Sequence, residues 1–115
     1  MKLPNLEQAI VEREKIVNYL LSATHVDGRP KAIFFGRFGF SAGSWVEFAD
    51  ALKGHAAEHD VEKMVATEFG VRYIIEGEMT GHDGRRPLVR AVWFTESGQE
   101  IPRLITAYPA RRRER

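Results

Sequence analysis

The chain has 115 residues, 17 Lys and Arg against 16 Asp and Glu, a formal net charge of +1, and no cysteine. This length fits one domain of ordinary size. The absence of cysteine excludes disulfide scaffolds, thiolate nucleophiles and cysteine-ligated metal centres. No apolar run reaches the ~18 residues of a membrane span, and the first residues lack a basic-then-apolar signal pattern. We therefore expect a cytoplasmic protein.

The positive charge is concentrated at one end of the chain. Residues 110–115 hold four Arg and one Glu, whereas the preceding residues hold 13 basic and 15 acidic side chains and are slightly acidic. We expect a single domain over residues 1–109, followed by a basic flexible tail over 110–115. Such a tail can bind nucleic acid or can simply be a solvated chain end.

Three helices are predicted in the first half of the sequence. After a short strand over 9–11, apolar residues at helical spacing predict a helix over 12–22. An Asp-Gly turn and a proline then precede a second helix over 31–38, which ends at Gly39. The third helix, over 45–58, presents one apolar stripe made of Trp45, Phe48, Ala49 and Leu52.

The second half is rich in β-branched and aromatic residues, which predict strands joined by glycine-containing turns. The predicted strands are a weak one over 61–66 and three stronger ones over 71–79, 88–95 and 101–108. Because 88–95 is apolar on both faces, it is predicted to be a central strand. The sequence therefore predicts an α+β fold, in which N-terminal helices pack on one face of a three- to four-stranded antiparallel sheet.

One short string has the order of a metal-binding motif. His55-Ala56-Ala57-Glu58-His59 matches the inverted zinc-protease pattern, with two imidazoles one helical turn apart and a glutamate as general base. In such proteases a third ligand lies on a downstream helix, whereas strands follow here. The alternative is a charged helix end without a metal. We favour that alternative and predict neither a metal nor a cofactor.

A second polar cluster occupies the loop before the second helix. His25, Arg29 and Lys31 place an imidazole and two cations beside a predicted helix start, where backbone N–H groups favour anions. This arrangement predicts a phosphate site in which His25 transfers protons. The alternative is an exposed loop whose polar residues only cap the helix.

The last strand carries three further candidates, Arg103, Thr106 and Tyr108. Strict alternation along the strand would put Thr106 and Tyr108 on one face together with Leu104. The two hydroxyls could then serve one ligand. The alternative is a half-buried strand whose tyrosine packs against a helix.

From Leu3-Pro4-Asn5 to the closing Thr106-Ala107-Tyr108-Pro109, the sequence resembles a bacterial family of domains without an assigned function. It is more loosely similar to ribonuclease toxin domains of the barnase, EndoU and RelE-like group, which place helices before a sheet that closes on Thr-x-Tyr. Those enzymes cleave RNA through its own 2′-hydroxyl and need no metal. The resemblance implies that His25 is the general base or acid, that Lys31 and Arg103 stabilise the phosphorane, and that Thr106 and Tyr108 position the phosphate.

The sequence supports two functional hypotheses. The first is a metal-independent, toxin-like ribonuclease with RNA as its substrate. The alternative is a non-catalytic protein-binding or immunity-like module, which the near-neutral charge and the lack of a self-evident site favour. In that case the partner is a protein, such as a toxin or an immunity protein, and the exposed sheet edges could also pair two copies into a homodimer.

Overall fold

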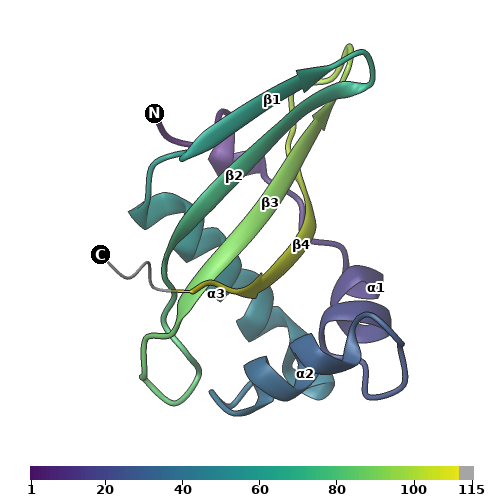
Figure 1. Ribbon diagram of the computed structural model, residues 1–115, viewed down its shortest axis with the longest axis vertical. Helices are drawn as coiled ribbons and strands as arrows, with labels where there is room; N and C mark the ends of the chain where they lie inside the picture. Colours follow the sequence, from purple (N-terminus) through teal and green to yellow (C-terminus); the bar gives the residue numbers. More distant parts are fainter. Residues whose placement is uncertain (112–115) are drawn as a thin grey trace.

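The computed structural model describes residues 1–111 and confirms the α+β fold, with the helices on one face of a four-stranded antiparallel sheet (Figure 1). No helix within these residues is long and apolar enough to cross a membrane. Of the basic tail predicted over 110–115, only the first two residues fall inside the described range.

The helical half begins with a short 3-10 turn, η1 (Leu6–Gln8). Helix α1 (Arg13–Lys15) continues into a π-helical turn, η2 (Ile16–Leu20), so the helix predicted over 12–22 is shorter than expected. Helix α2 (Arg29–Gly36) starts two residues before its prediction, with proline in its first turn, where the missing N–H costs nothing. A second 3-10 turn, η3 (Ala42–Ser44), leads into α3 (Trp45–Glu58), which has the predicted bounds.

The sheet is a meander in which each strand pairs antiparallel with the next. Its strands are β1 (Lys63–Thr67), β2 (Gly70–Glu78), β3 (Leu88–Glu96) and β4 (Arg103–Pro109). The short strand predicted over 9–11 reduces to one parallel bridge beside β4. There the Ile10 N–H donates to the Pro102 carbonyl at 2.9 Å, and the Ile10 carbonyl accepts from the Leu104 N–H at 2.9 Å.

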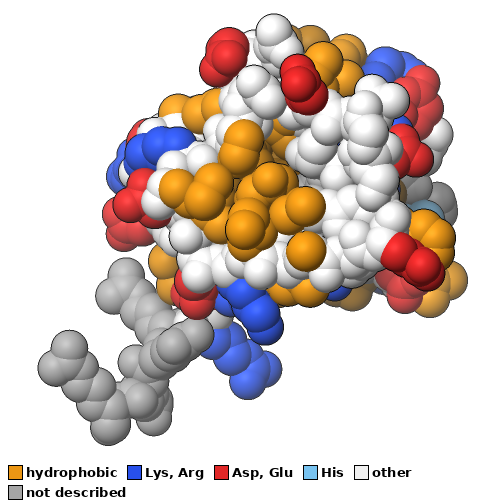
Figure 2. All heavy atoms as spheres, turned by 90° about the horizontal axis from the view of Figure 1, so that it is seen from above, with side chains coloured by type: hydrophobic (Ala, Val, Ile, Leu, Met, Phe, Trp, Pro, Cys, Tyr) orange, Lys and Arg blue, Asp and Glu red, His pale blue; other side chains and the backbone are white. Residues whose placement is uncertain are grey.

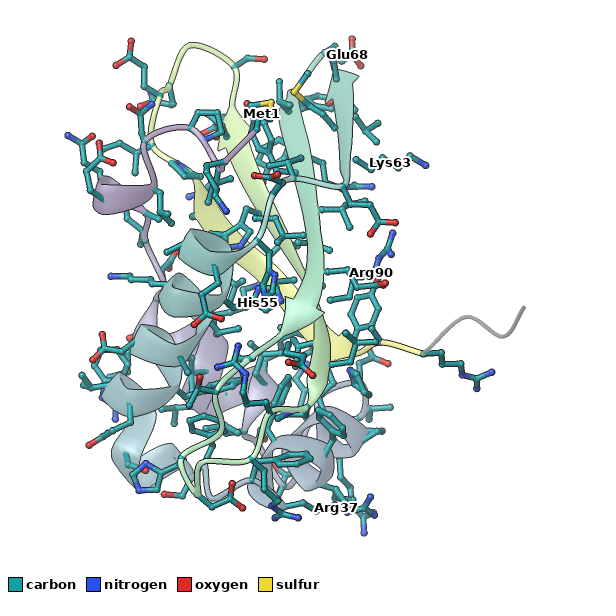
Figure 3. The ribbon with its side chains drawn as sticks, turned by 90° about the vertical axis from the view of Figure 1, so that its left-hand side faces the viewer. Met1, Arg37, His55, Lys63, Glu68 and Arg90 are labelled. Carbon is teal, nitrogen blue, oxygen red and sulfur yellow. The ribbon has the colours of Figure 1, made fainter. Side chains whose placement is uncertain are left out.

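The hydrophobic core lies between the sheet and the helices. Trp93 and Ile75 from the sheet and Phe35 and Phe48 from α2 and α3 are fully buried. The other face of the sheet has no helix over it in the described residues. Figure 3 shows Lys63 and Arg90 on this uncovered face, and His55 on the side of α3.

A β-bulge in β4 changes which side chains share a face. The register pairs Val92 with Thr106 but Trp93 with Leu104, so Ile105 is an extra residue in β4. Leu104 and Ala107 are therefore both buried against the core. The predicted grouping of Leu104 with Thr106 is wrong, because the extra residue reverses the alternation between them.

Candidate functional site

Tyr19 lies at the centre of a polar cluster that joins three separate parts of the chain. Its hydroxyl is 3.1 Å from the Thr106 hydroxyl in β4, and its ring meets the His25 ring edge to face, with the centroids 5.0 Å apart. The Lys31 ammonium lies 5.1 Å from the centre of the Tyr19 ring, and the Lys15 ammonium lies 5.5 Å from it. We call Tyr19, His25, Lys31 and Thr106 the Tyr19 cluster.

The loop that carries His25 is folded tightly by its own hydrogen bonds. The Ser22 hydroxyl accepts from the His25 N–H at 3.1 Å. The imidazole Nδ1 accepts from the N–H groups of Asp27 and Gly28, at 3.1 and 3.0 Å. Gly28 is required at this point, because a β-carbon there would overlap the carbonyl oxygen of Tyr19. The loop thus holds the imidazole against the tyrosine ring.

These hydrogen bonds also determine where the imidazole carries its proton. Because two backbone N–H groups donate to Nδ1, that nitrogen has no hydrogen, and the neutral ring of His25 carries its proton on Nε2. In this arrangement Nε2–H can donate a hydrogen bond but cannot accept a proton. Proton abstraction within the cluster therefore requires another group.

Tyr19 is the group whose ionisation the surroundings favour. Partial burial on its own raises the pKa of Tyr19, but hydrogen bonds from Thr106 and Lys31 and the positive charges of Lys31 and Lys15 outweigh it. The pKa of the phenol is consequently lower than that of an ordinary tyrosine, because each of these groups stabilises the phenolate. Tyr19 was not predicted as a site residue, because its position beside the apolar stripe of a helix is typical of a core residue.

The five residues predicted from the sequence fall into two groups. His25, Lys31 and Thr106 meet around Tyr19. Tyr108 lies on the uncovered face of the sheet, where it pairs in register with Arg90. Arg103 begins β4 and forms an ion pair with Glu96, at 3.7 Å. Arg103 and Thr106 are three positions apart in β4, which corresponds to about 10 Å along a strand.

The uncovered face of the sheet extends from the Tyr19 cluster across all four strands. Thr106 in β4 is paired through Val92 and Ile74 with Lys63 in β1, so one row of side chains crosses this face. Arg90 on the same face is held by Glu76 at 3.0 Å. Lys63 has no ion-pair partner within residues 1–111, so its charge is available to a ligand.

The residues of the zinc-like string do not converge on one point. Nε2 of His55 donates to the Val89 carbonyl at 2.9 Å, and Nε2 of His59 donates to the Glu78 carbonyl at 2.7 Å. Glu58 accepts from Arg86 instead of facing a metal. Burial lowers the pKa of His55, which favours its neutral form. Across residues 1–111, no group of three or more His, Asp or Glu side chains is arranged to hold a metal ion.

Comparison with protein families gives a match over residues 2–111, to the domain of unknown function DUF6883. The chain belongs to this family. The fold is also similar to a solved chain from a contact-dependent growth inhibition toxin–immunity protein complex from Klebsiella pneumoniae 342. The two chains are 17% identical with a TM-score of 0.70, and the alignment covers 88% of this chain and 99% of the other. This likeness is one of fold. Comparison with the curated proteins gave no match.

Proposed function

We propose that this DUF6883 domain is a toxin-like ribonuclease that works without a metal. The observation that carries the proposal is the Tyr19 cluster, which gathers a phenol, an imidazole N–H donor, an ammonium and a hydroxyl from three parts of the chain. These are the groups that cleavage through the 2′-hydroxyl needs: a base, donors to the phosphate oxygens, and a proton source. The similarity of fold to a chain of a toxin–immunity complex agrees with this proposal.

In the proposed reaction the Tyr19 phenolate takes the proton of the 2′-hydroxyl while the 2′-oxygen attacks the adjacent phosphorus. The bond from phosphorus to the 5′-oxygen breaks, and the Lys31 ammonium gives a proton to the departing oxygen. His25 Nε2–H and the Thr106 hydroxyl donate to the phosphate oxygens, which gain charge in the transition state. The products are a 2′,3′-cyclic phosphate and a 5′-hydroxyl.

The uncovered face of the sheet is the surface on which we place the rest of the RNA. Lys63 and Arg72 project from this face without ion-pair partners in residues 1–111, and Phe94 offers a partly exposed ring. Cations that contact phosphates and aromatic rings that stack on bases are the two elements of single-strand binding. Arg103 and Tyr108 flank the reacting centre on this surface and would contact the RNA outside it.

The direct test is incubation of the purified protein with mixed RNA in the presence of EDTA. The proposal predicts cleavage with 2′,3′-cyclic phosphate ends, and a loss of about 100-fold in rate for His25→Ala. His82→Ala is the matched control, since His82 is also an exposed histidine but lies outside the Tyr19 cluster. Absence of cleavage, or equal loss in the two variants, would contradict the proposal.

A second candidate function, protein binding of the immunity type, is favoured by a different surface. Figure 2 shows hydrophobic side chains gathered on the end of the molecule that carries the β1–β2 turn. Met64 in β1 and Phe69 in the turn are 55% and 70% exposed, and exposed apolar patches often mark protein interfaces. Light scattering tests the homodimer form of this idea. A dimer that Phe69→Ser converts to a monomer would support it, and a monomeric wild-type protein would exclude the homodimer.

A further inference from the structure

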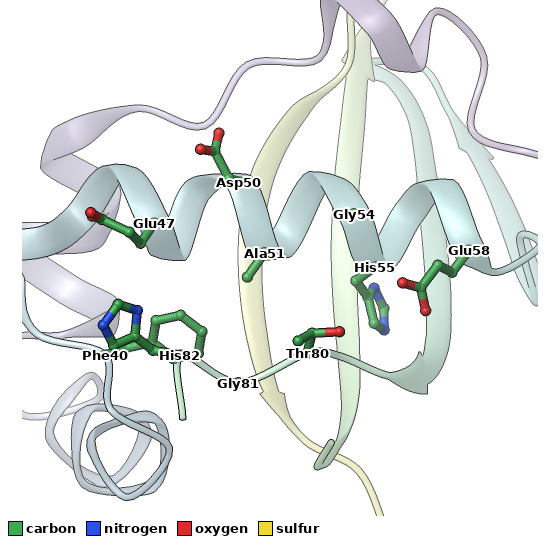
Figure 4. A pocket seen from close by; sticks show the side chains of 10 residues that line it. All are labelled: Phe40, Glu47, Asp50, Ala51, Gly54, His55, Glu58, Thr80, Gly81 and His82. Carbon is green, nitrogen blue, oxygen red and sulfur yellow. The ribbon is translucent and has the colours of Figure 1, made fainter. Parts of the chain in front are cut away.

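A groove of about 370 Å³ runs between α3 and residues 80–82, which come after β2 (Figure 4). Ala51 and Gly54 form its middle, so the surface of the helix is low there. Figure 4 shows Glu47 beyond one end of this middle section and Glu58 beyond the other. The groove uses none of the residues of the Tyr19 cluster, so a ligand bound in it is independent of the proposed ribonuclease activity.

The charged side chains of α3 that line the groove are all carboxylates. Glu47 and Asp50 form no hydrogen bond or ion pair with any residue in the described range 1–111. Glu58 is the exception, because the Arg86 guanidinium donates to it at 2.6 Å and also donates to the Thr80 hydroxyl at 2.6 Å. The groove therefore attracts cations, and one guanidinium of the protein itself already binds at one end.

His55 in the wall of the groove adds an acceptor that nothing in the described chain satisfies. Its Nε2 faces the carbonyl oxygens of Val89 and Gly77, at 2.9 and 3.2 Å, and must carry the ring proton. Nδ1 then has a free lone pair. The side chain is 1% exposed, and no donor within residues 1–111 reaches Nδ1. A buried acceptor without a partner is unfavourable, and a donor entering the groove would relieve this.

Gly54 leaves the space over the middle of α3 open. Glycine is among the least favourable residues in the interior of a helix. A β-carbon at Gly54 would meet no other atom within 4 Å, so packing inside the protein does not require glycine there. A side chain at this position would instead project into the groove, between Asp50 and Glu58.

We propose that this groove binds an arginine side chain presented by a partner protein. On the α3 side of the groove the carboxylates and His55 Nδ1 only accept hydrogen bonds, so an occupant that lies against α3 must bring donors and positive charge, whereas Thr80 and His82 line the opposite side. A guanidinium brings five N–H donors in a rigid plane, and its stem can lie over Ala51 and Gly54.

The test is a titration of the full-length protein with N-acetyl-arginine N-methylamide, followed by NMR of the ¹⁵N-labelled imidazoles. We expect a saturable change in the Nδ1 resonance of His55, because the new donor engages that lone pair. The citrulline counterpart has the same shape without the charge and should give no saturable change. Equal responses to the two compounds, or no response of His55 to the arginine compound, would overturn the proposal.

Variants of the groove separate binding from folding. The double variant Glu47→Gln/Asp50→Asn should weaken arginine binding by about fivefold or more, whereas Glu14→Gln, an exposed acid of α1, should leave it unchanged. Gly54→Ala should raise the melting temperature, as alanine favours a helix, and still weaken arginine binding because its methyl group fills the groove. If none of the groove variants weakened arginine binding, the arginine would bind elsewhere and the proposal would be refuted.

Discussion

Acidification should destabilise this fold through His55, and the size of the effect depends on the surroundings of the ring. The side chain is 1% exposed and its Nε2 donates to the Val89 carbonyl. Burial lowers the pKa of the imidazole below its ordinary value of 6.5. At pH values below 6.5, the imidazole of the unfolded chain binds a proton that the imidazole of the folded protein does not. Stability is therefore complete above the unfolded pKa, and it falls with pH by up to about 1.4 kcal/mol per pH unit.

The assay is urea unfolding at constant ionic strength, at several values between about pH 5 and pH 7.5. His55→Gln keeps a side-chain donor but removes the titrating group. The free energy of unfolding of this variant should therefore depend less steeply on pH, and the difference in slope should correspond to at most one bound proton. The absolute stability of this variant is also lower, and for that reason the slope is the readout. His82→Gln is the control for an exposed histidine and should keep the wild-type slope. If His55→Gln kept the same slope as the wild type, the buried neutral histidine could not be the cause of the loss of stability at low pH.

Three further substitutions test the packing. Gly28→Ala should cost about 2 kcal/mol or more by urea unfolding, because the new methyl group overlaps the backbone of Tyr19; a neutral result would contradict the close approach. Gly77→Ala should cost less, about 1 kcal/mol. Its methyl group meets the His59 ring, which can move away if it gives up its hydrogen bond to the Glu78 carbonyl. A cost above that of Gly28→Ala would refute this ranking. Phe35→Ala should cost about 3–5 kcal/mol, since Phe35 is fully buried, and a cost near zero would show that α2 is not part of the core.

The fold was largely predictable because its signals are local. The apolar stripe from Trp45 to Leu52 predicts α3, and glycine-containing turns between β-branched segments predict the order of the strands. The π-helical turn at Ile16–Leu20 and the bulge at Ile105 were not predictable. Neither has a distinctive residue, and both result from how α1 and β4 are packed in the folded chain.

The candidate site was only partly predictable, for a related reason. The grouping of His25 with Lys31 is predicted by their closeness in sequence, but Tyr19 and Thr106 are 87 residues apart. Their contact depends on where η2 lies relative to β4. Tyr108 shares its face with Thr106, as the alternation predicts. The hydroxyl that reaches Thr106, however, belongs to Tyr19, which comes from outside the sheet.

The most direct measurement of the central claim is the pH dependence of RNA cleavage in EDTA by wild type, Tyr19→Phe and Tyr108→Phe. If the Tyr19 phenolate is the base, the wild-type rate rises with pH as the phenol ionises, and it levels off below the pKa of about 10 of an ordinary tyrosine. Tyr19→Phe should lose about 100-fold or more and no longer rise, whereas Tyr108→Phe should retain both the rise and most of the rate. An unchanged pH profile in Tyr19→Phe, or the larger loss in Tyr108→Phe, would contradict the assignment of Tyr19 as the base.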